Sequence, residues 1–402
     1  MRKTITIGDL GTIITGKTPP TTNKNYYGDY AVFIKPTDIS EQSKYTYETE
    51  EMYSKLAAEK YESSLIPKGA ICVPCIGTIG TKMTMAPCDC YTNQSINSIV
   101  CNENYDNEYV YYLIKNFLPG LKAYNLGTAS GREYVSKSNF EKIELVAEQD
   151  KTIQKRIGVI LSRYDSLIEN YQKQIKLLEE AAQRLYKEWF VDLHFPGHEN
   201  TKFVDGVPEG WEKKSVKTIV ELQSGYAFKS SDFASDGIYK IVTIKNVKDG
   251  AFDGENVSKI ASIPEKMPKH CILEDGDILL SLTGNVGRVC IVVGKNYLLN
   301  QRVAKLKSIF KAYTYCLFRS RDMFIDVNNL ANGAAQQNVS PIKIGEMKIL
   351  IPENKLLNEF EKESSNYISG VIAFQSQIRL LTEARDRLLP KMMSGEIEFN
   401  FK

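Results

Sequence analysis

An internal repeat constrains the fold of this chain more than any other feature of its sequence. The stretch IPKGAICVPCIGTIGTKMTM, from Ile66, resembles LEDGDILLSLTGNVGRVCIV, from Leu273. Gly77 therefore aligns with Gly284, at an offset of 207 residues. Self-similarity at a fixed offset indicates one structural unit that occurs more than once. We expect two domains with similar backbones within the 402 residues.

Further matches extend the repeat over much of each half. The stretch TNQSINSIV, from Thr92, aligns with LNQRVAKLK, from Leu299, and YVSKSNFEKIEL, from Tyr134, resembles NVSPIKIGEMKIL, from Asn338. Within both copies, short runs rich in Ile, Val, Tyr and Thr alternate with Gly, Pro and Asn, which predicts strands separated by turns. The segments NEYVYYLIKNFL and AYTYCLFRSRDMFID predict short helices. Each copy is therefore expected to begin with an α+β domain.

Two long segments follow these domains and predict long helices. From Gln149 to Phe190 there is no proline, and apolar side chains recur at alternating spacings of four and three residues. The segment from Leu357 to Leu388 keeps the same spacing, and Pro390 is expected to mark its end. This spacing is typical of coiled coils, and about 40 helical residues reach roughly 60 Å. We favour packing of the two helices on each other over the alternative that each helix covers only its own domain.

The sequence thus predicts an α+β protein in which two pseudo-repeated mixed α/β domains are separated by two long antiparallel coiled-coil helices. The predicted boundaries are residues 1–147 for the first domain, 148–190 for the central helix, 191–211 for a linker, 212–352 for the second domain, 353–394 for the C-terminal helix and 395–402 for a tail.

One motif suggests a nucleotide-binding enzyme, and the repeat argues against it. GTIITGKT, from Gly11, fits the phosphate-binding pattern G-x-x-x-x-G-K-[ST]. A phosphate loop must lead directly into a helix, but Thr18 precedes two prolines, and a residue before proline is disfavoured in helical geometry. The second copy keeps a glycine at Gly225 and lacks the lysine and threonine. We therefore do not expect an NTPase.

The cysteines raise the question of a zinc site. Cys72 and Cys75 precede Cys88 and Cys90, which together could supply four thiolates. In the second copy, however, leucines occupy the positions of Cys72 and Cys75. A strand position that accepts either Cys or Leu is better explained by the core, and no metal site is predicted. The sequence also has no apolar run near the roughly 18 residues of a membrane span, so we expect a cytoplasmic protein.

Three stretches connect the repeat to a known family. They are AAQRLYKEWFVDLHFPGHE, GVPEGWEKKSVKTIVELQSGYAFKSSDF and LTEARDRLLPKMMSGEIEF. With them, the whole chain resembles the specificity (S) subunit of type I restriction-modification systems. The resemblance implies two target-recognition domains that alternate with two helices, and the paired helices set the distance between two half-sites. It further implies binding to double-stranded DNA, recruitment of two methyltransferase (M) subunits, and association with restriction (R) subunits.

The resemblance also implies that the chemistry resides in partner chains. The assembly methylates adenine N6 in a bipartite site or cleaves unmodified DNA. This chain has no N-P-P-Y-type methyltransferase motif and no convincing cofactor loop. We expect a non-catalytic subunit without a cofactor or metal of its own, with S-adenosylmethionine, ATP and Mg on partner subunits. Two alternatives remain open: a coiled-coil scaffold that binds no DNA, and a stand-alone DNA methyltransferase.

The family often ends each recognition domain with Gly-x-x-Gln before a valine. The second copy has this pattern from Gly333 to Gln336, followed by Val339, whereas the first copy reads GTASGREYV from Gly127 and lacks the glutamine. No role of that glutamine can therefore be transferred to the first domain.

Residues that read different half-sites should lie where the two copies differ, whereas shared residues are better read as turn formers or phosphate contacts. Each candidate could instead be an ordinary surface residue. The DNA-binding candidates are Lys17, Thr18, Lys35, Thr37, Thr78, Lys82, Asn93 and Arg132 in the first domain, and Lys229, Lys245, Asn246, Asn285, Arg288 and Arg302 in the second. At the end of the central helix, Tyr186, Trp189 and Phe190 are predicted to bind a partner through an exposed apolar surface, unless they pack on the neighbouring domain.

Overall fold

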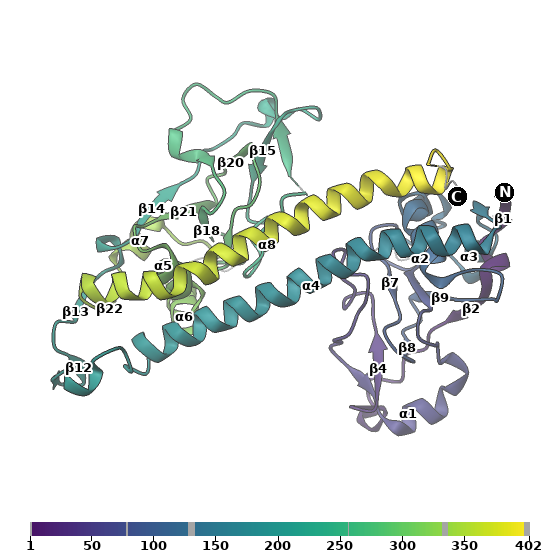
Figure 1. Cartoon of the computed structure of the whole chain (residues 1–402), viewed down its shortest axis with the longest axis horizontal. Helices are drawn as coiled ribbons and strands as arrows, with labels where there is room; N and C mark the ends of the chain where they lie inside the picture. Colours follow the sequence, from purple (N-terminus) through teal and green to yellow (C-terminus); the bar gives the residue numbers. More distant parts are fainter. Residues whose placement is uncertain (1, 78, 128–132, 256, 332–336, 398–402) are drawn as a thin grey trace. The chain divides into compact units, whose positions relative to one another are not determined.

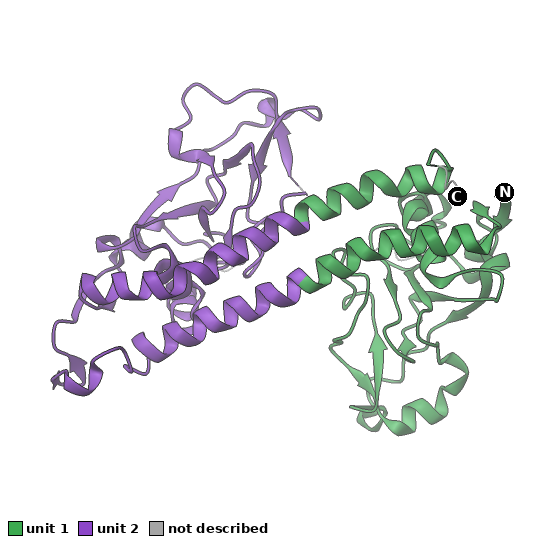
Figure 2. Cartoon of the chain, viewed as in Figure 1, with its two compact units in different colours: residues 1–170, 379–402 green, residues 171–378 purple. Residues whose placement is uncertain are grey.

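The computed structural model describes residues 2–77, 79–127, 133–255, 257–331 and 337–397, and Figure 1 shows its elements. The chain forms two compact units, coloured separately in Figure 2. Unit 1 comprises Met1–Asn170 and Arg379–Lys402, and unit 2 comprises Tyr171–Ile378. The two long helices therefore contribute residues to both units. No helix among the described residues is long and apolar enough to cross a membrane.

Among its described residues, unit 1 contains ten strands and three short α-helices in addition to parts of the long helices. The strands are β1 (Arg2–Thr6), β2 (Gly11–Thr15), β3 (Tyr27–Gly28), β4 (Ala31–Ile34), β5 (Met52–Tyr53), β6 (Ile71–Pro74), β7 (Thr84–Met85), β8 (Tyr91–Thr92), β9 (Ile96–Cys101) and β10 (Glu144–Glu148). The helices are α1 (Lys55–Lys60), α2 (Asn107–Phe117), α3 (Lys137–Glu141) and the first part of α4 (Lys151–Phe190).

The described residues of unit 2 contain twelve strands, and both long helices contribute to it, α4 from Tyr171 onward. Its strands are β11 (Phe203–Val204), β12 (Val207–Pro208), β13 (Glu212–Ser215), β14 (Glu221–Ser224), β15 (Tyr239–Val242), β16 (Ser258–Ile260), β17 (Ile272–Leu273), β18 (Ile278–Ser281), β19 (Val289–Ile291), β20 (Tyr297–Leu299), β21 (Val303–Lys307) and β22 (Lys348–Ile351). Its helices are α5 (Lys311–Arg319), α6 (Arg321–Asn329), α7 (Pro341–Glu346) and the first part of α8 (Asn354–Ser394).

Two sheets of each unit share one topology, which confirms the repeat; the third sheet differs at its edges, with the order β3-β5-β4-β8 in unit 1 and β16-β15-β20-β17 in unit 2. Unit 1 has a pair β1–β10 and a four-stranded sheet in the order β2-β9-β6-β7; unit 2 has a pair β13–β22 and a sheet in the order β14-β21-β18-β19. In a further sheet of each unit, one pair of neighbouring strands is parallel, β4 with β8 and β15 with β20. Each unit therefore contains an α+β domain, as the sequence predicts.

The core of unit 1 explains the cysteine pattern. All four residues of β6 are buried, and the next residue, Cys75, is only 2% exposed. Burial raises the pKa of the thiols of Cys72 and Cys75 to about 12, so both behave as small apolar side chains at neutral pH. Cys90 is buried as well, whereas Cys88 is exposed. Among the described residues, no group of three or more His, Cys, Asp or Glu side chains is placed to hold a metal ion.

In unit 2 the two long helices run antiparallel. Tyr171 of α4 stacks on Phe374 of α8, with ring centroids 5.1 Å apart. Further along α4, Tyr186 meets Phe360 with ring centroids 6.3 Å apart. Residue numbers rise along one helix as they fall along the other, as an antiparallel seam requires. Pro390, which was expected to mark the end of the apolar spacing, lies inside α8, and the helix continues to Ser394, the predicted bound of the C-terminal helix.

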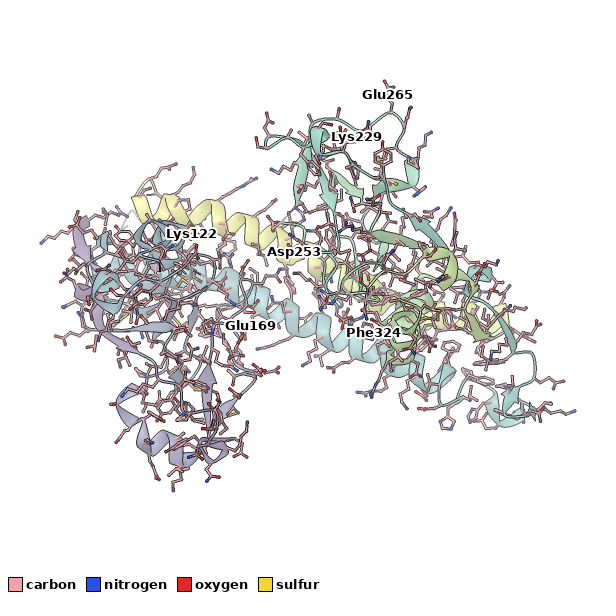
Figure 3. The ribbon with its side chains drawn as sticks, turned by 180° about the vertical axis from the view of Figure 1, so that it is seen from behind. Lys122, Glu169, Lys229, Asp253, Glu265 and Phe324 are labelled. Atoms are coloured by element: carbon pink, nitrogen blue, oxygen red, sulfur yellow. The ribbon has the colours of Figure 1, made fainter. Side chains whose placement is uncertain are left out.

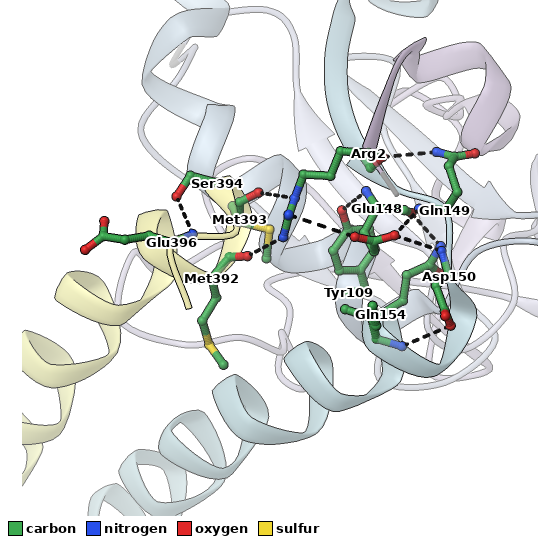
Figure 4. A network of polar contacts seen from close by, with 12 residues as sticks. Arg2, Tyr109, Glu148, Gln149, Asp150, Gln154, Met392, Met393, Ser394 and Glu396 are labelled. Atoms are coloured by element: carbon green, nitrogen blue, oxygen red, sulfur yellow. Dashed lines mark hydrogen bonds and ion pairs between the residues drawn. The ribbon is translucent and has the colours of Figure 1, made fainter. Parts of the chain in front are cut away.

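In unit 1 a polar network joins the α+β domain to the ends of both long helices (Figure 4). The guanidinium of Arg2 donates hydrogen bonds to the carbonyls of Met393 (3.0 Å) and Met392 (3.1 Å), near the end of α8. It also lies 4.0 Å from the carboxylate of Glu148. That carboxylate accepts a hydrogen bond from the backbone N–H of Asp150, at 3.0 Å, just before α4 begins. The pair β1–β10 therefore fixes where the domain meets the helices.

Candidate DNA interface

A turn at the end of β8 in unit 1 is held by Asn93. Its backbone N–H donates to the carbonyl of Ile34 at 3.0 Å, and its carbonyl accepts from the N–H of Ile96 at 3.1 Å. Its side-chain Oδ1 accepts from the backbone N–H of Ser95 at 3.1 Å. The oxygen of this side chain is therefore engaged in the turn, which fits the interpretation of the shared Asn as a turn former.

The same turn recurs at the end of β20 in unit 2. The N–H of Asn300 donates to the carbonyl of Val242 at 3.1 Å, and its carbonyl accepts from the N–H of Val303 at 2.9 Å. Its Oδ1 accepts from the backbone N–H of Arg302 at 3.2 Å. One hydrogen-bond framework thus presents Ser95 in unit 1 and Arg302 in unit 2.

A glycine lets β2 or β14 approach this turn closely. A Cβ atom on Gly16 would lie 2.1 Å from the carbonyl oxygen of Thr92, and one on Gly225 would lie 2.2 Å from that of Asn300. These distances leave no room for a side chain. The aligned Gly77 and Gly284 are required for another reason, since their φ angles are +84° and +73°, in the region that glycine adopts without strain.

A second loop, after β4 or β15, also has one framework in both units. The Oδ2 of Asp38 accepts from the N–H of Lys35, and the Oδ1 of Asn246 accepts from the N–H of Thr243, both at 2.8 Å. The Nδ2 of Asn246 donates to the carbonyl of Asp253 at 2.9 Å, and the residue is 0% exposed. The prediction that Asn246 contacts DNA does not fit this position, because the side chain stabilises the loop from inside.

The predicted cations of unit 1 are partly engaged within the protein. The Nζ of Lys35 lies 2.7 Å from the carboxylate of Glu50 and 3.2 Å from that of Glu51. Burial lowers the pKa of Lys35, but the bonds to the two carboxylates outweigh burial and raise it overall. The Nζ of Lys17 donates to the Oγ of Ser63 at 3.2 Å. Lys35 would have to give up two carboxylates before it could neutralise a phosphate, which makes it the weakest candidate in this unit.

The other candidates of unit 1 lie on the surface or outside the described residues. Thr18 is exposed and its hydroxyl donates to the side-chain oxygen of Gln94, a residue that the sequence analysis did not select. Thr37 is exposed and Lys82 is half-buried. The candidates Thr78 and Arg132, like the pattern from Gly333 to Gln336, lie outside the described residues.

Two adjoining hollows mark the surface of unit 2. One, of about 370 Å³, is lined by four polar residues, and the other, of about 690 Å³, shares Gln301 and Arg302 with it. The larger hollow also includes the predicted Lys245. The lining residues are Thr283, Gln301, Arg302 and Asn338 in the first, and Thr243, Ile244, Lys245, Glu255, Val257, Ser258, Asn300, Gln301 and Arg302 in the second.

The hollows do not include the other three candidates of unit 2. Lys229 is exposed (Figure 3), and its backbone N–H donates to the carboxylate of Asp232 at 3.0 Å. Asn285 is exposed, and Arg288 is half-buried. Sequence reasoning missed Thr283 and Asn338, although both differ from their aligned residues in the first copy.

The expectation of an exposed partner surface at the end of α4 is not met. Tyr186 and Trp189 are each 7% exposed and belong to the core of unit 2. Phe190 packs at its edge, with its ring centroid 4.9 Å from those of Tyr313 and Phe360. The three aromatic side chains thus cover the neighbouring domain, which was the alternative in the sequence analysis. An apolar periodicity could not distinguish these two roles.

Comparison with known proteins identifies the family. A model of the type I restriction modification DNA specificity domain matches residues 2–180 and 208–366. The type I restriction enzyme MjaIX specificity subunit of Methanocaldococcus jannaschii is 27% identical over 405 residues, which cover 97% of this chain and 92% of the relative. The MjaVIII specificity subunit of the same organism is 29% identical over 310 residues, 74% of this chain and 71% of the relative.

A solved structure shares the fold. The S subunit of a type I restriction-modification system from M. genitalium superposes with a TM-score of 0.56 over 98% of this chain and 96% of its own length. Its sequence identity is 16%, so this likeness concerns the fold. Because the family model matches both copies of the repeat, the chain belongs to the family of type I restriction-modification DNA specificity domains.

Proposed function

We propose that this chain is the sequence-specificity subunit of a type I restriction-modification complex, and that unit 1 and unit 2 each read one half of a bipartite double-stranded DNA site. The observation that supports this most directly is one backbone framework with two different surfaces. The turns at Asn93 and Asn300 have the same hydrogen bonds, yet they present Ser95 in unit 1 and Arg302 in unit 2. Two domains that share a backbone but differ in surface side chains can bind two different half-site sequences.

Catalysis in this proposal belongs to partner chains. The relatives are named as specificity subunits of restriction enzymes, and we assign no catalytic residue to this chain. It would recruit two methyltransferase subunits, which bind S-adenosylmethionine, and restriction subunits, which use ATP and Mg. The formal net charge of +2 is small for a DNA-binding protein. Partner subunits would therefore supply part of the charge that neutralises the phosphates.

The DNA contacts of this proposal come from the exposed or half-exposed candidates. They are Lys17, Thr18, Thr37 and Lys82 in unit 1, and Lys229, Lys245, Asn285, Arg288 and Arg302 in unit 2. Thr283, Gln301 and Asn338 join them because they line the same hollow as Arg302.

A domain exchange tests the proposal. Residues 7–143 would be replaced by the corresponding segment of a relative, which leaves β1, β10 and the contacts of Arg2 in place. The chimaera would be co-expressed with the methyltransferase subunit, and methylated adenines would be mapped across the host genome. We expect one half of the recognised site to change and the other to remain. Replacement of residues 216–347 should change only the other half. A change of both halves by one exchange, or the same methylation without this chain, would contradict the proposal.

A further inference from the structure

The smaller hollow of unit 2 is built on a defined backbone arrangement. Thr283 and Asn338 form an antiparallel bridge, and the N–H of Leu282 donates to the carbonyl of Arg302 at 3.0 Å. The hydroxyl of Thr283 donates to the Oδ1 of Asn338 at 2.8 Å, which fixes the orientation of that amide. Together with Gln301 these residues form a polar lining of hydrogen-bonding groups around the hollow.

Unit 1 repeats this backbone with other side chains. Ile76 and Tyr134 form the corresponding antiparallel bridge, and the N–H of Cys75 donates to the carbonyl of Ser95 at 2.7 Å. The four lining positions are Thr283, Gln301, Arg302 and Asn338 in unit 2, and Ile76, Gln94, Ser95 and Tyr134 in unit 1. Only the glutamine is shared. The two units thus share the backbone of this site but differ in three of its four side chains, as expected for a pocket that determines specificity.

Arg302 is the one charged residue of this set. It is exposed, and its backbone is fixed because its N–H donates to Asn300 Oδ1 at 3.2 Å. Among the described residues, no carboxylate forms an ion pair with its guanidinium. The planar guanidinium presents donors in a fork that matches the O6 and N7 acceptors of guanine in the major groove. Neither serine nor isoleucine, which occupy two of the corresponding positions in unit 1, can form such a pair.

We propose that Arg302 reads a guanine in the half-site of unit 2, from the pocket that it forms with Thr283, Gln301 and Asn338. The inference rests on the proposed function and adds the base and the residue that recognises it. A phosphate contact would carry no sequence information, and both copies of a reader need phosphate contacts equally. Arg302 instead occupies a position at which the copies differ, between two hollows and beside fixed amide groups. In unit 1 the corresponding position is Ser95, so its half-site is recognised there without an arginine.

The test uses the complex of the full chain with its methyltransferase subunits. The recognised site of the wild-type complex would first be mapped, and DNA libraries would then be randomised one position at a time in both half-sites. For Arg302→Gln, we expect the preference for guanine at one position of the unit 2 half-site to fall by about 5- to 150-fold, with the unit 1 half-site unchanged. For Arg302→Lys, we expect a guanine preference at the same position that is weaker than in the wild type, because lysine can also donate to guanine. Lys295→Ala, at an exposed lysine outside the hollows, is the matched control and should leave every position unchanged.

The possible results separate this inference from the function on which it rests. A wild-type complex that methylates no bipartite site would contradict the proposed function itself. A bipartite site whose unit 2 half contains no guanine would overturn only the role of Arg302. The same follows if Arg302→Gln lowers methylation equally at all sequences, which would identify a phosphate contact. Should Arg302→Gln fail to fold in a thermal melt, the decision rests on Arg302→Lys: an unchanged preference at every position would overturn the inference.

Discussion

Asp165 of α4 and Arg385 of α8 form a buried ion pair in unit 1, although they are 220 residues apart in the sequence. Their side chains are 6% and 7% exposed. The hydroxyl of Tyr112, in α2, donates to the same carboxylate. The short helix of the recognition domain and both long helices therefore meet at one carboxylate, which connects the domain to its helical support through polar groups as well as apolar packing.

We expect removal of one partner of this pair to destabilise the protein strongly. Arg385→Met leaves the Asp165 carboxylate buried without its cation and should lower the free energy of unfolding by about 3–5 kcal/mol. The double variant Asp165→Asn/Arg385→Met removes both buried charges, and its asparagine can still accept from Tyr112; Asp386, the exposed second partner of Arg385, loses its ion pair in both variants. It should recover most of the loss. Urea unfolding of the four proteins of this cycle measures the coupling; strictly additive effects would show that the pair is not coupled.

Asn246 should matter for stability and not for sequence recognition. Asn246→Ala removes the hydrogen bonds of its side chain with the N–H of Thr243 and with the carbonyl of Asp253, which should cost about 1–3 kcal/mol. Lys245→Ala, at the exposed neighbour, should leave the free energy of unfolding within about 0.5 kcal/mol of the wild type. Denaturant unfolding gives both values, and methylation mapping should return the original site for Asn246→Ala. An altered half-site would return Asn246 to the candidates for DNA contact.

The stability of unit 2 should depend on pH through Glu179. Burial raises the pKa of this carboxyl, and Arg319 and the hydroxyl of Tyr315 lower it only in part, so it stays above the ordinary 4.5. The folded chain then keeps a proton that the unfolded chain has lost. The contribution of Glu179 is therefore largest below the unfolded pKa and is lost as pH rises through the folded pKa. In Glu179→Gln this decline should disappear. The thermal midpoints of the wild type and of Glu179→Gln would be measured against pH, from below the unfolded pKa of Glu179 to above its folded pKa. If the two proteins lose stability in parallel as pH rises, the pKa of Glu179 is not raised.

Gly225, which packs against the turn at Asn300, should not tolerate a side chain. A Cβ on Gly225 would lie 2.2 Å from the carbonyl oxygen of Asn300, so Gly225→Ala must displace the turn that presents Arg302. We expect loss of discrimination in the unit 2 half-site together with a lower melting temperature. Gly345 in α7 is the matched control, because an added Cβ would have its nearest neighbour at 3.5 Å. Gly345→Ala should be neutral or stabilise the helix by up to about 1 kcal/mol. Equal behaviour of the two variants would refute the steric argument.

The paired helices should set the spacing between half-sites. Tyr171 stacks on Phe374, so one heptad inserted after Gln172 and another after Phe374 would keep the seam in register. Each heptad adds roughly 10 Å of helix, and DNA rises about 3.4 Å per base pair. Methylation mapping should then show a spacer that is longer by up to about three base pairs, with both half-sites unchanged. An active double-insertion variant with the original spacer would contradict this role.

The repeat could be predicted because both copies keep the residues that their shared backbone conformation requires. Gly77 and Gly284 have positive φ angles, so the sequence keeps glycine at both places and the alignment becomes visible. The long helices were predictable for a similar reason, since a sustained apolar spacing has few structural meanings.

The surface could be predicted less well, because residue type does not determine burial. Asn246 differs from its aligned residue, Asp38, and so looked like a recognition residue, yet either side chain can accept the same backbone hydrogen bond. Trp189 and Phe190 are apolar and aromatic in a core as well as at an interface. The ion pair of Lys35 with Glu50 could not be predicted either, because only the folded loop brings the two side chains together.

The bond between Arg2 and the carbonyl of Met393 joins residues 391 positions apart, and this has a consequence for the order of synthesis. Unit 1 includes the end of α8 from Arg379 onward, whereas all of unit 2 precedes it. A ribosome therefore completes the second unit before the first can close. Until Leu389 and Met392 have emerged, the side chains of Ile157 and Leu161 that pack with them in the folded core lack their cover. From the synthesis of α4 until the end of α8 follows, α4 exposes to the chaperones of the cell apolar side chains that the finished protein buries.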